Sequence, residues 1–336
     1  MEFNELTDEQ RRQFVDLVQV FEQHEQAALK QKHSYAGSMR WLLRNGTEYL
    51  HRKKGKVEKS LGPRSLETEE IYDKFLHGRR TTEQRIKTLS EKLDQMAPVN
   101  RALNLGRVPF LTAKILRKLG EEELLGNLLQ LVGTNALWAY EAKSGIHLSS
   151  GILATTDADL LMDARKKLSF LSDDVRKKGI VGILQKIDST FEQRSERDFK
   201  AINSMGFSVD LIQPEDFSTQ LSGKARKTIT GETNDLHGAP IFGLHWLLNA
   251  PAFSAVAVGS DGYPLRISTV DPRAFVLHKL WISESSQRDP LKKQRDKHQA
   301  IAIADIATNY LNLKFDSRDL QALPRKLRNL LVEFVV

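Results

Sequence analysis

The chain has 336 residues, of which 40% are hydrophobic and 28% charged, a composition typical of a globular protein with room for two or three domains. It contains no cysteine, which excludes a disulfide framework, a zinc–cysteine site and a thiol nucleophile. The net charge of +7 is compatible with a nucleic-acid or nucleotide partner. Because no apolar run reaches ~18 residues and the first dozen residues are polar, we expect a cytoplasmic protein without a membrane partner.

The N-terminal part predicts two helical segments on either side of a small sheet. Apolar residues recur at helical spacing from Asp8 to Lys32, and Thr7 is a suitable N-cap. Residues 66–97 are again helical and heavily charged. We expect this second segment to break near Gly78 and to end at Pro98 and the Asn100-Arg101 region.

A short basic segment between these helices predicts a β-meander. Turn signals at Asn45-Gly46 and Lys54-Gly55 separate three short antiparallel strands. Residues 51–64 hold six Lys or Arg against one Glu, and with Trp41 and Tyr49 they suit contact with a nucleic-acid backbone. The alternative, which the pattern favours slightly, is a solvated hairpin whose basic edge strands discourage aggregation.

A junction that suits a phosphate group follows further along the chain. The apolar run Leu128–Val132 predicts a strand, Gly133-Thr134-Asn135 a turn, and residues 136–142 a helix. Such a junction directs backbone N–H groups and the positive end of a helix toward one point. Glycine is common at strand–helix turns, so the junction alone does not establish a phosphate site.

Two aspartates lie near the end of the next predicted strand, Ile152–Leu161. Because side chains alternate between the faces of a strand, Asp157 and Asp159 project from the same face. Two unpaired carboxylates this close repel each other, and a divalent cation such as Mg²⁺ removes the repulsion. The stretch on its own is equally compatible with two surface aspartates at a strand edge. A third carboxylate, Asp210, lies within another apolar strand, residues 207–212.

The C-terminal part predicts a hairpin followed by helices. Residues 240–270 are β-type, with a turn at Ser260-Asp261-Gly262. Asp271 is a suitable N-cap and Pro272 a suitable first residue for a helix, and a second helix is expected from Pro290 to about Leu313. The whole pattern predicts an α+β protein.

Val132-Gly133-Thr134, Asp157-Ala158-Asp159 and Asp210 together resemble the nucleotidyltransferase superfamily of the DNA polymerase beta type. There a hydrophobic–Gly–Gly/Ser turn precedes an acidic–hydrophobic–acidic motif, and a neighbouring strand carries a third carboxylate. The chain is more specifically similar to a bacterial family of nucleotidyltransferase-fold proteins, and its tail also resembles the abortive-infection type nucleotidyltransferases. The shared stretches are SLGPRS at 60–65, GRVP at 106–109, the motif at 154–159, PRAFVLHK at 272–279, and Arg295-Asp296 with Gln299-Ala300.

The resemblance implies a nucleotidyltransferase fold in three parts: an N-terminal helix and β-meander appendage over residues 1–100, a core with a short mixed sheet over 101–270, and a helical C-terminal part over 271–336. It also implies Mg²⁺-dependent transfer of a nucleoside monophosphate from an NTP, ATP being one candidate, to a hydroxyl of RNA, a protein or a small molecule. Of these acceptors, the basic meander favours a nucleic acid.

The same resemblance assigns roles to single residues. Asp157 and Asp159 would hold two Mg²⁺ ions, with Mn²⁺ as an alternative, and Asp210 would complete the ion that activates the acceptor hydroxyl. The nucleotide would be bound by the residues around its phosphates: Gly133, Thr134 and Asn135 on the turn, Lys279 as a counter-charge, and Arg295 and Asp296 in support. The alternatives are an ordinary solvated lysine at Lys279 and a surface charge pair at Arg295-Asp296.

The chain departs from the family pattern in two places. Thr134 stands where Ser or Gly is usual, and the 24 positions between Gly133 and Asp157 (157 − 133) exceed the usual spacing. We expect the additional segment, Glu141–Gly151, to reshape the mouth of the pocket. Two other functions stay open: a catalytically inactive nucleotide sensor or nucleic-acid adaptor, and a toxin-like or regulatory member of a two-gene system.

Overall fold

The computed structural model describes residues 3–153, 155–163, 165–166, 173–215, 228–231, 235–286, 288–315, 318–321 and 323–330. The chain divides into two compact units, one of residues 12–104 and one of residues 1–11 together with 105–336. The three-part division expected at residues 100 and 270 remains a prediction.

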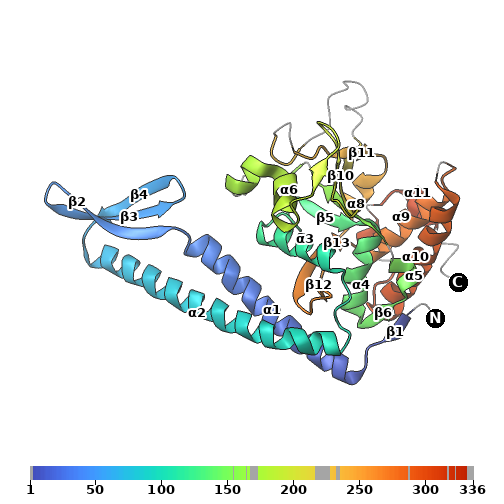
Figure 1. Ribbon diagram of the computed structural model, residues 1–336, viewed down its shortest axis with the longest axis horizontal. Helices are drawn as coiled ribbons and strands as arrows, with labels where there is room; N and C mark the ends of the chain where they lie inside the picture. Colours follow the sequence, from blue (N-terminus) through green and yellow to red (C-terminus); the bar gives the residue numbers. More distant parts are fainter. Residues whose placement is uncertain are drawn as a thin grey trace. The chain divides into compact units, whose positions relative to one another are not determined.

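The first unit, which we call the arm, is built on two long helices that lie side by side, α1 (Asp8–Ser34) and α2 (Leu66–Ala102) (Figure 1). They run antiparallel, because Gln13 Nε2 donates to Asn100 Oδ1 over 2.9 Å while Gln31 Nε2 donates to Glu83 Oε1 over 3.0 Å at the other end. The predicted cap at the start of α1 is confirmed: the backbone N–H of Gln10 donates to the Thr7 hydroxyl over 3.3 Å.

Helix α2 corrects one sequence-based expectation and agrees with another. It continues through Gly78, where a side chain would collide with the Tyr35 ring, so this glycine permits close packing rather than a break. It ends at Ala102, in agreement with the end expected from Pro98 and Asn100-Arg101. A proline removes one helical hydrogen bond, and the helix tolerates that loss close to its end.

The predicted β-meander is confirmed. Strands β2 (Ser38–Arg44), β3 (Thr47–Lys54) and β4 (Val57–Pro63) form an antiparallel sheet in that order. Asn45 and Gly46 adopt φ of 48° and 78°, and Gly55 has φ of 59°, as tight hairpin turns require. Met39 and Leu50 pack on Phe75 of α2 in a small core of the arm.

A mixed sheet forms the centre of the second unit, with strand order β5-β7-β10-β9-β8 and β11 paired to β10. Strands β7 and β10 are parallel, whereas β5 and β9 run antiparallel to their neighbours. The strand bounds are β5 (Leu129–Val132), β7 (Asp157–Met162), β8 (Glu192–Gln193), β9 (Lys200–Ile202), β10 (Ser208–Pro214) and β11 (Ala239–Ile241).

Helices and a hairpin pack around this sheet (Figure 1) and bury one continuous apolar core. The larger elements are α3 (Phe110–Glu121), α4 (Leu137–Ser144), α6 (Asp173–Ile187), β12 (Ala252–Val258), β13 (Pro264–Val270), α9 (Pro272–Glu284) and α10 (Pro290–Asn309). The shorter ones are β1 (Phe3–Glu5), η1 (Gly133–Ala136), β6 (Ile146–Leu148), α5 (Ser150–Leu153), α8 (Leu244–Asn249), η3 (Arg318–Leu320) and α11 (Arg325–Asn329).

The segment before the aspartate pair differs from its prediction. Ile152 and Leu153 lie in the short helix α5, and the strand begins only at Asp157. The pairing of β10 with β7 begins at Asp157 and that of β5 at Asp159, so in the part of the chain that the structure describes no strand pairs with Ile152 or Leu153.

The mixture of helices with small sheets confirms the predicted α+β class. The expected helix start at Asp271-Pro272 is also confirmed, since the Asp271 carboxylate accepts from the backbone N–H of Arg273 over 2.8 Å. None of the helices in the described ranges combines the length and the apolar character needed to cross a membrane.

Candidate active site

The three predicted carboxylates meet on one face of the central sheet. In the parallel pair of β7 and β10, Asp159 lies directly opposite Asp210, and Asp157 lies opposite Ser208. Residues opposite each other in a ladder, and residues two apart on one strand, share a face. The register therefore places Asp157, Asp159 and Asp210 together.

This clustering changes the acidity of the central carboxyl group. Burial, and then the negative charges of Asp157 and Asp210, raise the pKa of Asp159 to about 7. The ammonium groups of Lys279 and Lys200 oppose this rise only in part. Among the described residues, the cluster thus holds more negative charge than the neighbouring ammonium groups neutralise, which is the condition a divalent cation relieves.

Asp210 has one oxygen engaged and one without a partner. Lys200 on β9 pairs with it directly, with 2.9 Å between Lys200 Nζ and Asp210 Oδ2. Asp210 Oδ1 is buried and makes no hydrogen bond with any described group. A buried carboxylate oxygen without a partner is costly, so the donor set fits a hard cation such as Mg²⁺.

The site is not arranged as a closed metal cage. Within the described ranges, no three His, Asp or Glu side chains are grouped so as to hold a metal ion between them. Lys200 already binds one oxygen of Asp210, and Thr155 Oγ1 donates to Asp157 Oδ1. A cation at this face would compete with both contacts.

The predicted strand–glycine–helix junction exists and lies against the carboxylates. Val132 pairs with Asp159, and Gly133 follows at once with φ of 68°, in the left-handed region. A Cβ at Gly133 would overlap the Asp159 carboxylate, so only glycine allows this close approach.

The two residues after Gly133 are buried and already hydrogen-bonded. Asn135 Nδ2 donates to the backbone carbonyl of Asp157 over 2.6 Å, and its Oδ1 accepts from Trp138 Nε1 over 3.3 Å. Thr134 Oγ1 accepts from Gln299 Nε2 over 3.3 Å. These contacts fix the backbone of the turn and of Asp157. Nucleotide binding by Thr134 and Asn135 remains a prediction.

Lys279 belongs to a buried ionic network between α9 and α10. Its Nζ lies 2.7 Å from Asp296 Oδ1, and Arg288 lies 2.7 Å from the other oxygen of Asp296. Lys279 and Asp296 are both buried, which disfavours a solvated lysine or a surface charge pair at these positions. Burial lowers the pKa of Lys279, and the charges of Arg288 and Arg295 lower it further, while Asp296 raises it.

The additional segment Glu141–Gly151 ties the beginning of the chain to the core. Strand β6 within it pairs antiparallel with β1, and the buried Glu141 carboxylate binds Arg107 over 3.0 Å and the backbone N–H of Leu148 over 2.7 Å. The GRVP stretch has a structural position too, because a side chain at Gly106 would collide with the backbone carbonyl of Gly259. Reshaping of a pocket mouth by this segment remains a prediction.

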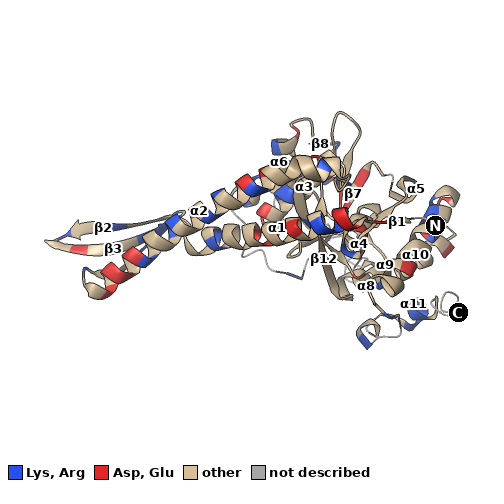
Figure 2. Cartoon of the chain, turned by 90° about the horizontal axis from the view of Figure 1, so that it is seen from below, with Lys and Arg blue, Asp and Glu red and all other residues tan. Residues whose placement is uncertain are grey.

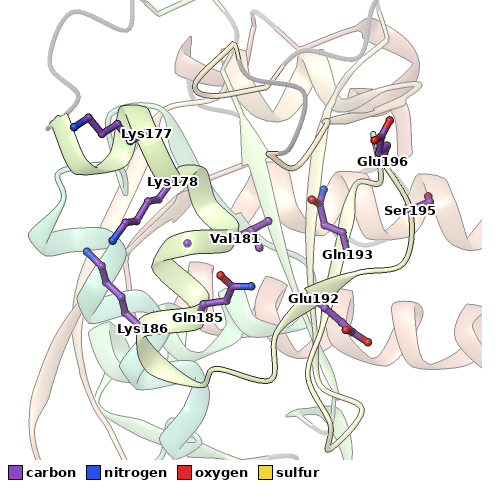
Figure 3. A pocket seen from close by; sticks show the side chains of 10 residues that line it. Lys177, Lys178, Val181, Gln185, Lys186, Glu192, Gln193, Ser195 and Glu196 are labelled. Atoms are coloured by element: carbon purple, nitrogen blue, oxygen red, sulfur yellow. The ribbon is translucent and has the colours of Figure 1, made fainter.

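A separate pocket of about 750 Å³ lies between α6 and the segment around β8 (Figure 3). It contains none of the predicted site residues. Three lysines on α6 line it together with polar residues of the β8 segment; the full lining is Lys177, Lys178, Val181, Gly182, Gln185, Lys186, Glu192, Gln193, Ser195 and Glu196.

Comparison with known proteins identifies the family. A family model described as nucleotidyltransferase matches residues 111–324. The chain belongs to this nucleotidyltransferase family. The match covers most of the second unit and includes all the predicted site residues, whereas the arm lies outside it. Neither a search of curated proteins nor a search of solved structures found a match.

Three side chains next to the predicted site were given no role from the sequence, although Gln299 belongs to one of the shared stretches. They are Lys200 on Asp210, Arg288 on Asp296, and Gln299, which bridges Thr134 and the Ile152 carbonyl. Lys200 could have been identified from the sequence. Lys200 and Asp210 lie at nearly equal distances along the chain from the turn near Asn203–Gly206, so a hairpin at this turn places their opposite charges on paired positions. The other two depend on how α10 docks, which local sequence does not specify.

Proposed function

We propose that this member of the nucleotidyltransferase family transfers a nucleoside monophosphate from an NTP to a hydroxyl acceptor at Asp157, Asp159 and Asp210. The observation that carries the proposal is the register of β7 and β10, which sets Asp159 opposite Asp210 with Asp157 on the same face. This uncompensated cluster lies beside the Gly133 turn, where a side chain is sterically excluded.

The donor set supports Mg²⁺, or Mn²⁺, as the ion. Asp157 and Asp159 would hold two ions between them, and the unpartnered Oδ1 of Asp210 would complete one of them. When bound, the ions supply charge neutralisation at the phosphates and a lower pKa for the acceptor hydroxyl. The raised pKa of Asp159 fits this assignment, because ion binding favours the ionised carboxylate.

The reaction forms a bond between the acceptor oxygen and the α-phosphorus and breaks the bond from that phosphorus to the bridging oxygen. Pyrophosphate leaves with the bond electrons, and a carboxylate near the acceptor, for which Asp210 is the candidate, accepts the hydroxyl proton. Lys279, held in place by Asp296, contributes positive charge toward the carboxylate cluster. The Gly133 backbone, which lies against the Asp159 carboxylate, would place its N–H groups near the phosphates of a nucleotide bound there.

Label transfer tests the proposal. The full chain is incubated with each NTP labelled at the α-phosphate and Mg²⁺, with total RNA, the protein itself or small alcohols as acceptor. We expect label on one acceptor class and loss of at least about a hundredfold in rate with Asp157→Asn, because the variant removes a charge that the ions require. The matched control is Asp305→Asn, an exposed aspartate on α10.

The alternatives give different results. Transfer of γ-label instead of α-label would show phosphoryl transfer and contradict the proposal. NTP binding that Asp157→Asn leaves unchanged, with no transfer to any acceptor, would favour the inactive sensor.

A further inference from the structure

Positive charge is concentrated on the β-meander of the arm. Residues 38–63 contain seven Lys or Arg against two Glu, whereas α2 contains seven basic and seven acidic residues, with both signs distributed along the helix (Figure 2). The meander therefore carries most of the chain's net charge of +7.

Four lysines surround the turn between β3 and β4. We call Lys53, Lys54, Lys56 and Lys59 the lysine turn. All four are exposed, and none of them forms an ion pair with another described residue. Arg40 on the neighbouring strand does have a partner, because it binds Glu58 over 3.2 Å. The lysine turn is thus a cluster of uncompensated charge on a sheet with its own packed core.

The chemistry of this surface fits a phosphate backbone rather than exposed bases. Proteins that bind single strands stack the bases on aromatic side chains. Of the two aromatic residues that the sequence offered for that purpose, Trp41 packs instead against Tyr72 at 5.8 Å between ring centroids and lies beneath the Arg64 guanidinium at 5.1 Å, and Tyr49 is only partly exposed. We therefore expect a partner of the lysine turn to be bound through its phosphate groups, as a duplex would be.

The shape of the turn distinguishes between duplexes. Gly55, with φ of 59°, makes the hairpin tight, and Lys53 and Lys54 project from opposite faces of β3. A narrow projection with cations on both sides matches two rows of phosphates that face each other across a narrow groove. The major groove of A-form RNA is deep and narrow, whereas that of B-DNA is about 12 Å wide.

We propose that the lysine turn binds the phosphate backbone of an RNA duplex without reading its sequence. This binding requires no nucleotide and no Mg²⁺. The RNA-binding proposal and the nucleotidyl-transfer proposal can therefore fail independently of each other.

The test measures binding of the full chain to a fluorescent RNA duplex of about 24 base pairs, longer than the ~16 that one duplex-binding module spans. The variant K53Q/K54Q/K56Q/K59Q is compared with K30Q/K74Q/K87Q/K92Q, which removes the same charge from α1 and α2. We expect at least about tenfold weaker binding at 50 mM salt for the first variant only. The slope of log K against log[salt] should become less negative by about 3, since each phosphate contact contributes ~0.9 in B-DNA.

The double variant K56Q/K59Q, which removes two of the four charges, should show about half of that slope change, and thermal melting checks that each variant folds. Unchanged affinity of the quadruple variant, or an equal loss in the control, would overturn the proposal. Equal affinity for a DNA duplex or a single strand of the same sequence, or equal retention on phosphatidylserine vesicles, would also overturn it.

Discussion

The carboxyl group of Asp159 responds most strongly to the charges of the site. Burial and two neighbouring carboxylates raise its pKa to about 7, and the backbone at Gly133 lies against its side chain. A group whose folded-state pKa is raised binds more protons in the folded than in the unfolded protein. Without a metal ion, the free energy of unfolding should therefore fall as the pH rises from about 4 to about 7 and then level off.

Asp159→Asn should remove this pH dependence. In the presence of a chelator, we expect the Tm of the variant minus the Tm of the wild type to increase by about 2 °C or more when the pH is raised from 5.5 to 8. Mg²⁺ at pH 8 should stabilise the wild type and not the variant. Asp305→Asn serves as the control. A Tm difference that is equal at both pH values would contradict the charge balance derived for the cluster.

At the scale of single residues, local sequence predicted the site unevenly. Strand alternation predicted that Asp157 and Asp159 share a face, and the strand–helix junction predicted the turn at Gly133, but neither stretch alone established a site. Asp210 needed the family resemblance, because its register opposite Asp159 is a long-range pairing. Gln299 and Arg288 were not predictable, since they reach the site only after α10 has packed against the rest of the unit.

Among the elements, α6 contains a sharp irregularity with a clear cause. Gly179 lies inside it with φ of 61° and ψ of −165°, and a Cβ there would collide with the buried Asp235 carboxylate. That carboxylate accepts from the backbone N–H of Ile180 over 2.8 Å and from that of Leu236 over 2.8 Å. The kink thus directs backbone N–H groups toward the buried Asp235 carboxylate, for which burial without hydrogen-bond donors would be costly.

Gly179→Ala should therefore be strongly destabilising. We expect a loss of about 3 kcal/mol in the free energy of unfolding, from the strained backbone together with the collision. Gly120→Ala is the matched control: this helical glycine has open space around its Cβ position, and we expect a gain of up to about 1 kcal/mol. Chemical denaturation measures both. A loss of no more than about 1 kcal/mol for Gly179→Ala would contradict the prediction, because it would mean that α6 rearranges to accommodate the side chain.

Elements with local signals were predicted well, and those that depend on packing were not. The meander turns at Asn45-Gly46 and Gly55 and the helix start at Asp271-Pro272 agree with the structure, because their residues determine the backbone directly. Gly78 was expected to break α2, but the close approach of Tyr35 explains its presence in a continuous helix. Ile152-Leu153 has β-type composition, yet it lies in the helix α5 and pairs with none of the described strands.

For the whole molecule, the family match and the two compact units divide the chain in a consistent way. The matched residues 111–324 lie within the second unit, which carries every candidate catalytic residue, while the basic meander belongs to the arm. The α+β class and the nucleotidyltransferase family were both predictable from the sequence. Within the arm, the lysine turn is the surface that we propose for RNA binding.

We propose that Asp157, Asp159 and Asp210 together bind two divalent ions. Counting bound Mn²⁺ by electron paramagnetic resonance, with a non-hydrolysable NTP present, tests it directly and needs no knowledge of the acceptor. We expect two ions for the wild type and one for Asp210→Asn. Lys200→Met should bind Mn²⁺ several-fold more tightly, because the competing ammonium is removed from Asp210. An unchanged count in Asp210→Asn, or no bound ion in the wild type, would contradict the account.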